Sequence, residues 1–155
     1  MAFYYQGIFK PKNPKKYKGN VNKIIFRSGL EKRFMLFLDN CPLIKIWNSE
    51  EIVVPYTSVD GKRHRYFVDF YVKTEIGQEW MVELKPFKQT KPPKKNNKNY
   101  LTESITFVKN QLKWESATKY AVSKGMRFVV ITDKEIKAEY SDKKLYENLK
   151  ESLEF

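Results

Sequence analysis

The sequence predicts an α/β fold in which an α+β mixed sheet is flanked by helices. Hydrophobic periodicity changes along the chain in the order helix, antiparallel strands, strand, helix, strand, helix. The dipeptide Asp60-Gly61 lies between two runs of β-forming residues and is a strong hairpin signal, so part of the sheet should be antiparallel. The strand–helix–strand unit over 79–132 should form a right-handed parallel crossover, which makes the sheet mixed.

The first helix is expected over 30–38. Apolar residues recur there at helical spacing, at Leu30, Phe34, Phe37 and Leu38. Ser28 stands at the N-cap position, and Cys41-Pro42 ends the helix. Two short runs rich in β-forming residues, 43–47 and 52–56, are expected to follow as strands.

A long aromatic strand is expected over 65–72, directly after the hairpin turn. It is apolar on both faces except at Asp69, which indicates a central position in the sheet. A further strand over 79–85 follows the turn at Gly77 and ends at Pro86. Asp69 therefore stands as a lone charge in a strand that is otherwise built for burial.

The second half of the chain begins with an exposed basic loop over 86–99, which contains three Pro and five Lys. A long helix is expected over 102–124, with Gly125 as its C-cap. A buried type of strand over 127–132 and a charged helix over 142–153 complete the fold. We found no internal repeat and expect a single domain over 1–155.

Composition excludes several classes of protein. Cys41 is the only cysteine, so neither an internal disulfide nor a cysteine-based zinc cluster can form. No apolar stretch approaches the roughly 20 residues of a membrane span, and the N-terminus lacks the pattern of a signal peptide. We therefore expect the protein to work in a reducing cytoplasm, or inside a particle assembled there.

The net charge of +12 is concentrated in two segments. One is a basic N-terminal arm over 1–27, expected to be extended or mobile around Lys10 to Lys16, and the other is the loop over 86–99. Clustered positive charge is typical of proteins that bind a phosphate backbone. A solvated basic surface that adheres to an anionic membrane is the alternative, and we favour nucleic acid.

Four triplets place a carboxylate two residues before a lysine: Asp60-Gly61-Lys62, Glu83-Leu84-Lys85, Glu135-Ile136-Lys137 and Asp142-Lys143-Lys144. The first is a hairpin turn, and the last two lie in charged, helical stretches, where a spacing of two separates the side chains. Only the triplet at Glu83 follows an apolar strand, where two-residue spacing puts both side chains on one face. Local context therefore singles out Glu83 and Lys85.

Asp69 and Glu83 are separated by 13 residues, about one hairpin, so adjacent antiparallel strands would bring them side by side. Two close carboxylates repel each other, and a divalent cation relieves that repulsion. Oxygen-only ligation suits Mg²⁺. The alternative is a structural ion pair between Asp69 and Lys85, with Glu83 solvated.

Glu31 is the third acid of interest. Ser28-Gly29-Leu30-Glu31 fits a capping box, which is a purely structural role. Glu31 also shares a side of its helix with Met35 and Leu38, so it should point toward the edge of the sheet. Capping and metal binding are compatible, and both roles stay open.

The pattern Asp69…Glu83-x-Lys85, with Glu31 on a preceding helix, resembles the PD-(D/E)xK restriction-endonuclease-like superfamily, with Val68 in place of the usual Pro. Longer stretches resemble the head-completion nucleases of tailed phages and are similar to TnsA-type transposon endonucleases. These stretches are Pro11 to Asn20, Arg27 to Glu31, Trp47 to Glu50, Asp60 to Phe70, Lys113-Trp114 and Gly125 to Phe128. Together they cover most of the chain.

The resemblance implies a restriction-endonuclease-like core and a DNA nuclease. Glu31, Asp69, Glu83 and the Leu84 carbonyl would hold one or two Mg²⁺ (or Mn²⁺), and Lys85 would position water or stabilise charge on the phosphate. The implied substrate is packaged double-stranded phage DNA, processed before heads and tails join. Phage head, portal or tail proteins are then the expected partners, in the host cytoplasm or the virion.

Two alternatives stay open: a non-catalytic DNA-binding or virion-assembly protein on the same fold, and an endonuclease subunit of a transposition machine. Contacts to DNA are expected from basic and polar residues of the arm, the loop and the long helix: Lys12, Lys15, Lys16, Lys18, Arg27, His64, Lys88, Lys94, Lys95, Gln111 and Lys113. For His64 an exposed strand position without function is favoured, and for Gln111 and Lys113 a solvated helix face is favoured.

Overall fold

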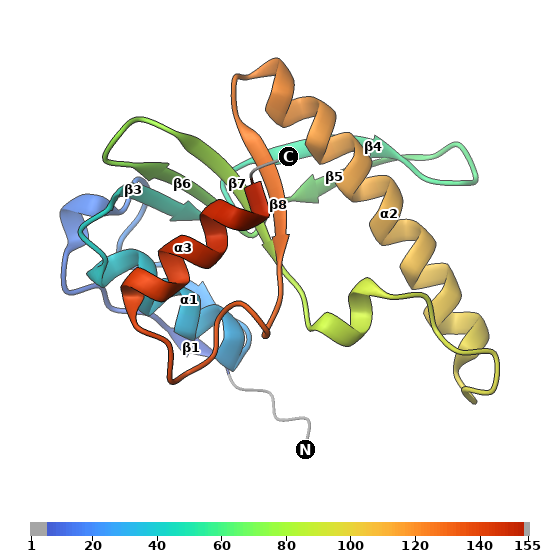
Figure 1. The fold of residues 1–155 in the computed structure, drawn as a ribbon. Helices are drawn as coiled ribbons and strands as arrows, with labels where there is room; N and C mark the ends of the chain where they lie inside the picture. The colour runs from blue at the N-terminus through green and yellow to red at the C-terminus, as the bar shows by residue number, and fades with distance from the viewer. Residues whose placement is uncertain (1–5, 154–155) are drawn as a thin grey trace.

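A computed structural model describes residues 6–153 and contains a four-stranded mixed sheet (Figure 1). The strand order is β3 (Ile44–Ser49), β6 (Phe70–Thr74), β7 (Glu79–Leu84) and β8 (Arg127–Ile131). The first three strands pair antiparallel, and β7 pairs parallel with β8. The predicted mixed sheet, with a helix connecting its two parallel strands, is therefore confirmed.

Helices cover both faces of this sheet. On one face α1 (Gly29–Asn40) and α3 (Asp142–Leu153) share a core with β7, which contributes Trp80, Val82 and Leu84. On the other face α2 (Tyr100–Ser123) covers Met81. Alternate residues of β7 thus point to opposite helices, as the two-residue period of a strand requires. The first half of α2 projects beyond the sheet (Figure 1).

The predicted strand over 65–72 is wrong as a single element. The chain forms two strands in different sheets: β5 (Arg63–Phe67), which pairs with β4 (Val53–Thr57), and β6. Between them the Val68 N–H bonds to the Ile52 carbonyl, and the Asp69 carbonyl accepts the Glu50 N–H. Val68 is buried under α2, whereas Phe70 is buried under α1, so the backbone must cross between layers at Asp69.

The N-terminal arm is not extended or mobile over residues 6–27, and that expectation was wrong. The arm forms β1 (Gly7–Ile8), η1 (Pro14–Lys16) and β2 (Ile25–Phe26). Four of its apolar side chains are buried in the core beneath α1: Phe9, Tyr17, Ile24 and Phe26. Burial of these large side chains offsets the entropy of ordering the segment. The first five residues of the arm lie outside the described range.

The remaining predicted elements occur within a few residues of their expected positions. Ser28 caps α1 by accepting the Glu31 N–H, and Gly125 (φ 72) follows α2 in the left-handed region that suits glycine. The basic loop is exposed but contains a short helix, η2 (Phe87–Thr90). Within residues 6–153 no helix has the length and apolarity to cross a membrane.

Candidate active site

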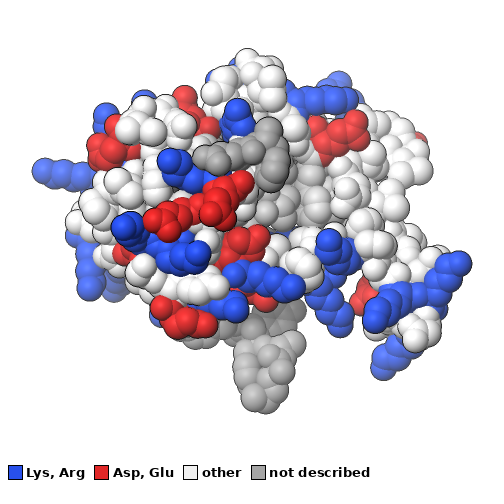
Figure 2. Space-filling view, in the orientation of Figure 1, with Lys and Arg blue, Asp and Glu red and all other residues white. Residues whose placement is uncertain are grey.

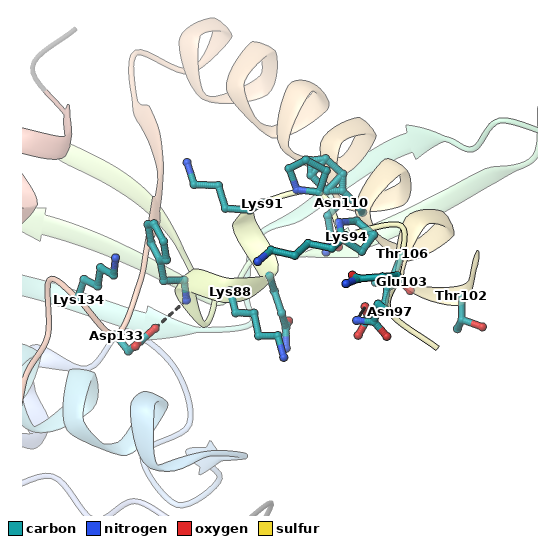
Figure 3. Close-up of a pocket in the computed structure, with 16 residues that line it drawn as sticks. Lys88, Lys91, Lys94, Asn97, Thr102, Glu103, Thr106, Asn110, Asp133 and Lys134 are labelled. Carbon is teal, nitrogen blue, oxygen red and sulfur yellow. Dashed lines mark hydrogen bonds between the residues drawn. The ribbon is translucent and has the colours of Figure 1, made fainter. Parts of the chain in front are cut away.

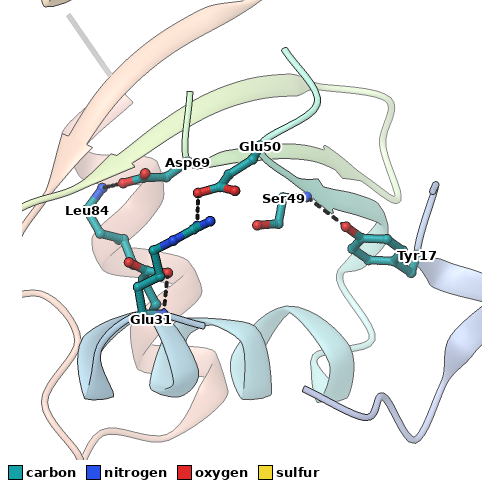
Figure 4. Close-up of polar contacts among 7 residues, drawn as sticks. Tyr17, Glu31, Ser49, Glu50, Asp69 and Leu84 are labelled. Atoms are coloured by element: carbon teal, nitrogen blue, oxygen red, sulfur yellow. Dashed lines mark hydrogen bonds and ion pairs between the residues drawn. The ribbon is translucent and has the colours of Figure 1, made fainter. Parts of the chain in front are cut away.

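Asp69 and Glu83 lie side by side at the ends of neighbouring strands. Because Phe70 pairs with Val82 in the antiparallel register, the next pair outward is Asp69 and Glu83. Both side chains project to the α2 face, opposite to Val82. The Leu84 N–H donates to Asp69 Oδ2 at 2.9 Å, which fixes the carboxylate against β7 (Figure 4). The predicted juxtaposition across one hairpin is thus present.

Glu83 is buried, whereas Asp69 beside it is partly buried. Glu83 is 6% exposed, and its Oε1 has no hydrogen-bond partner among the described residues. Burial and the charge of Glu83 raise the pKa of Asp69 well above its usual range, although the Leu84 N–H opposes this shift. Two close like charges with little access to water are unfavourable unless one is protonated or a cation lies between them. The orphaned oxygen and the all-oxygen donor set fit a hard divalent ion.

Lys85 extends from the same strand end. Its Nζ lies 4.0 Å from Glu83 Oε2, a loose ion pair, and the side chain is 24% exposed. The Lys85 N–H donates to the Ile131 carbonyl at 2.9 Å, so the backbone at this point is held by β8. The alternative of an Asp69–Lys85 pair with a solvated Glu83 is not found, because Glu83 is the buried partner. Lys85 therefore borders the carboxylates and stays accessible to a ligand.

Glu31 lies in the first turn of α1, three residues after the N-cap Ser28, and close enough to Glu83 to be affected by its charge. Its Oε2 accepts the Arg27 N–H at 3.0 Å, one residue earlier than a standard capping box. Burial raises the pKa of Glu31, the Arg27 N–H opposes this, and the charges of Glu50 and Glu83 raise it further. Within residues 6–153 no three acidic, His or Cys side chains are gathered tightly enough to hold a metal ion as placed. Glu31 as a ligand therefore stays a prediction.

Glu50 is a residue that the sequence reasoning did not assign. Its backbone is in the left-handed region (φ 58), which is unfavourable for a residue other than glycine, and its N–H donates to the Asp69 carbonyl at 3.1 Å. Its carboxylate is bound by the Arg27 guanidinium (Figure 4). Only its place in the motif Trp47 to Glu50 hinted at a role.

Lys113 approaches the same site from α2. Its Nζ lies over the rings of Tyr56 and Tyr66, at 5.9 and 5.4 Å from their centroids. Burial and the neighbouring Lys109 lower the pKa of Lys113, whereas the charges of Glu83 and Asp69 oppose this shift. Gln111 is exposed on another side of the helix. Gln111 therefore lies on a solvated helix face, as favoured from the sequence, whereas Lys113 is partly buried.

Tyr66 lies on the α2 side of the two carboxylates. Burial, followed by the charge of Glu83, raises the pKa of its hydroxyl. The hydroxyl is buried without a hydrogen-bond partner among the described residues, as is Nε1 of the partly buried Trp114. Aromatic side chains therefore border the site on its α2 side.

Comparison with known proteins assigns the chain to a family. Residues 41–133 match the family described as TnsA-like endonuclease N terminal. The chain belongs to this endonuclease family. The head completion nuclease of Enterobacteria phage T4 is 39% identical over 142 residues, which cover 86% of this chain and 95% of that protein. The resemblance inferred from the motifs is confirmed, and the endonuclease match contains Asp69, Glu83 and Lys85, whereas Glu31 precedes it.

The predicted DNA contacts fall into separate regions of this endonuclease fold. Arg27 borders the acidic site, and the loop residues Lys88, Lys94 and Lys95 are exposed beyond Lys85. His64 is exposed on β5 and stacks on Tyr56, with its Nε2 3.0 Å from Ser58 Oγ. This arrangement matches the favoured structural alternative for His64.

The basic arm lies at the other end of α1. Lys12 and Lys15 are exposed there, about eight residues or roughly 12 Å along the helix from Glu31. Lys18 is exposed beside β3, where its N–H donates to the Trp47 carbonyl at 2.9 Å. Lys16 is different, because its Nζ donates to the carbonyls of Asp39 and Cys41 at 3.0 and 2.8 Å. Its ammonium caps the C-terminus of α1, so we leave Lys16 out of the proposed DNA contacts.

Proposed function

We propose that this protein is a Mg²⁺-dependent deoxyribonuclease that hydrolyses phosphodiester bonds. The observation that carries the proposal is the adjacent carboxylates of Asp69 and Glu83, since Glu83 is buried with one unpartnered oxygen and Lys85 lies beside it. Membership of an endonuclease family supports the reaction class. Mn²⁺ is an alternative ion, because it accepts the same oxygen donors.

Glu31, Asp69, Glu83 and the Leu84 carbonyl would hold the ion, which when bound would polarise the scissile phosphate and acidify a water. The Leu84 N–H keeps the Asp69 carboxylate oriented. Lys85 stabilises the negative charge that builds on the phosphate, because its ammonium is accessible and held next to Glu83. Tyr66 and Lys113 exclude water from the α2 side.

The biological role proposed is head completion in a tailed phage, with packaged double-stranded DNA as the substrate. The named T4 relative supports this role, since the alignment covers nearly all of that protein. Head, portal or tail proteins are the proposed partners, in the host cytoplasm or the virion. The TnsA-like match alone favours a transposon endonuclease subunit, and a pull-down with head proteins and with transposase proteins separates the two.

Cleavage of supercoiled plasmid in Mg²⁺ and in EDTA tests the reaction. We expect nicked or linear DNA in Mg²⁺ only, and loss of cleavage by at least about 100-fold in Lys85→Ala. Lys144→Ala is the matched control, because Lys144 belongs to a triplet of the same pattern but is exposed on α3. Circular dichroism should show both variants folded. Full activity of Lys85→Ala would contradict the role of Lys85. Binding of DNA by the wild type without any cleavage would contradict the nuclease proposal and favour an assembly protein.

A further inference from the structure

A basic groove lies next to the candidate active site, between the loop after β7 and the first half of α2 (Figure 3). Its volume is about 1030 Å³, and Asp133 and Lys134 belong to its lining. Four lysines line it: Lys88, Lys91, Lys94 and Lys134. The proposed catalytic residues do not line this groove, so it is a separate feature of the surface.

The positive charge of the groove is not neutralised by its own acids. Asp133 and Glu103 are the two carboxylates in the lining. Asp133 accepts the Phe87 N–H at 2.7 Å, and Glu103 accepts the Asn97 side-chain amide at 2.7 Å. Within residues 6–153 neither acid forms an ion pair with a groove lysine. The groove therefore presents four ammonium groups to an anionic ligand.

Asn110 adds a neutral polar side chain to the lining. It is 5% exposed on α2. Its amide can both donate and accept hydrogen bonds. The groove thus offers a polar contact in addition to its lysines.

Two aromatic side chains, Phe87 and Phe107, also line the groove. Phe87 is covered by the ammonium groups of Lys134 and Lys91, at 3.4 and 5.4 Å from its centroid. The half-buried Phe107 makes no ring contact within the described residues, so it is available to stack on a ligand. Cations that follow a backbone, together with aromatic faces that accept bases, are typical of sites for single-stranded nucleic acid.

Two elements lead from the groove to the acidic site. Phe87 follows Lys85 by two residues, a separation of at most about 7 Å along the backbone. Asn110 precedes Lys113 by three residues, close to one helical turn, and Lys113 is near enough to sense the charges of Asp69 and Glu83. A strand whose phosphate lies beside Lys85 would therefore enter the groove within one or two nucleotides.

We propose that this groove binds an unpaired DNA strand adjacent to the scissile phosphate, which directs the nuclease to places where a duplex opens into a single strand. Its volume is that of a pocket for a drug-sized ligand, about 300–1,000 Å³, and it suits a few nucleotides of one strand better than a duplex. The idea that the groove directs cleavage rests on the proposed nuclease function. The idea that the groove binds an unpaired strand does not.

Fluorescence anisotropy in EDTA tests the groove without cleavage. The probes are a blunt duplex and the same duplex with an oligothymidine tail, and the readout is the ratio of the two affinities. We expect Asn110→Ala, Phe107→Ala and Lys91→Ala each to reduce the preference for tailed DNA about tenfold, since one base–aromatic stack contributes about 1–3 kcal/mol. Lys98→Ala is the matched control, because Lys98 is an exposed loop lysine outside the groove lining.

Unchanged ratios in all three groove variants would overturn the proposal, and so would equal losses for blunt and tailed DNA, which would assign the groove to duplex binding. If Asn110→Ala fails to fold by thermal melting, Lys91→Ala decides, because Lys91 is exposed. The two proposals fail independently. Loss of tail preference with intact plasmid cleavage rejects only the groove, and tail preference without Mg²⁺-dependent cleavage rejects only the nuclease.

Discussion

Asp69 is a residue whose placement is unfavourable for folding and suits the metal binding proposed above. Its carboxylate lies beside Glu83, and burial, followed by the charge of Glu83, raises its pKa. Protonation or a bound cation would relieve this repulsion. An arrangement of this kind is common at functional sites, where groups are placed against their own solvation preference.

We expect Asp69→Asn to stabilise the metal-free protein at neutral pH. Because the folded pKa of Asp69 lies above its unfolded value of about 3.9, wild-type stability is highest below that pH and falls as pH rises, by at most about 1.4 kcal/mol per pH unit. The amide does not titrate, so the variant should melt above wild type at pH 8 in EDTA and level with it near pH 4. Thermal melts across pH measure this difference.

Adding Mg²⁺ supplies the control for that prediction. Wild type should gain stability with the ion concentration, and Asp69→Asn should gain much less. Equal melting temperatures for the two proteins at pH 8 in EDTA would contradict the idea that the carboxylate pair is strained in the free protein.

Glu50 is also unfavourable for folding, because of its backbone conformation. A non-glycine residue at φ 58 is strained by about 1–2 kcal/mol, and this one is also tied to Arg27 and to the Asp69 carbonyl. We expect Glu50→Gly to raise the free energy of unfolding by about 1 kcal/mol and to slow cleavage, because the carboxylate is lost. Glu50→Gln should slow cleavage without stabilising. Urea unfolding and plasmid cleavage give the two readouts, and a Gly variant no more stable than the Gln variant would argue against strain.

At the scale of elements, the site depends on where one strand ends and another begins. The break between β5 and β6 places Asp69 at the end of the sheet, across from Glu83. The arm docks on α1 in a similarly local way, since Asp39 at the end of that helix accepts the N–H groups of Lys12 and Asn13. These bonds hold η1 against the core.

We expect Asp39→Ala to destabilise the protein by about 2 kcal/mol, because Asp39 is buried and two backbone donors would lose their acceptor. Hydrogen exchange should then show faster opening of residues 12–17 than of the central sheet. Lys15→Ala is the control, since Lys15 is exposed and makes no such contact. Uniform loss of protection across the chain would mean that the arm does not open separately.

At the scale of the whole molecule, charge is distributed unevenly. Figure 2 shows Lys and Arg gathered over the loop after β7 and the start of α2, whereas the face formed by α1 and α3 carries both signs. An anionic duplex is therefore attracted to one part of the surface, next to the acidic site. The repulsion between DNA and the carboxylates there is another reason to expect a bound cation.

Duplex binding should weaken steeply with salt. The slope of log affinity against log salt falls by about 0.9 for each phosphate contact removed, so Lys95→Ala, in the loop but outside the groove lining, should reduce it by about 1. Lys143→Ala with Lys144→Ala, on the mixed-charge face, should leave it unchanged. A salt titration by anisotropy measures both slopes. A flat response of the wild type would exclude backbone binding by the loop.

Local patterns were sufficient for most elements of this protein and for its candidate acids. Helical and strand periods predicted α1, α2, α3 and most strands, because burial of one face leaves a repeat in the sequence. The triplet Glu83-Leu84-Lys85 could be distinguished from the three other triplets of the same pattern, because only it follows an apolar strand. The pairing of Asp69 with Glu83 followed from hairpin geometry and was found in the structure.

Tertiary structure alone decided which layer each segment joins. The segment 65–72 has one continuous hydrophobic pattern, yet it forms two strands that divide at Asp69, because Val68 and Phe70 pack in cores beneath different helices. The arm orders because distant core residues cover its aromatic side chains, and Lys113 and Glu50 reach the site through contacts far apart in sequence. Sequence periodicity records that a side chain is buried, but only long-range packing determines what it is buried against.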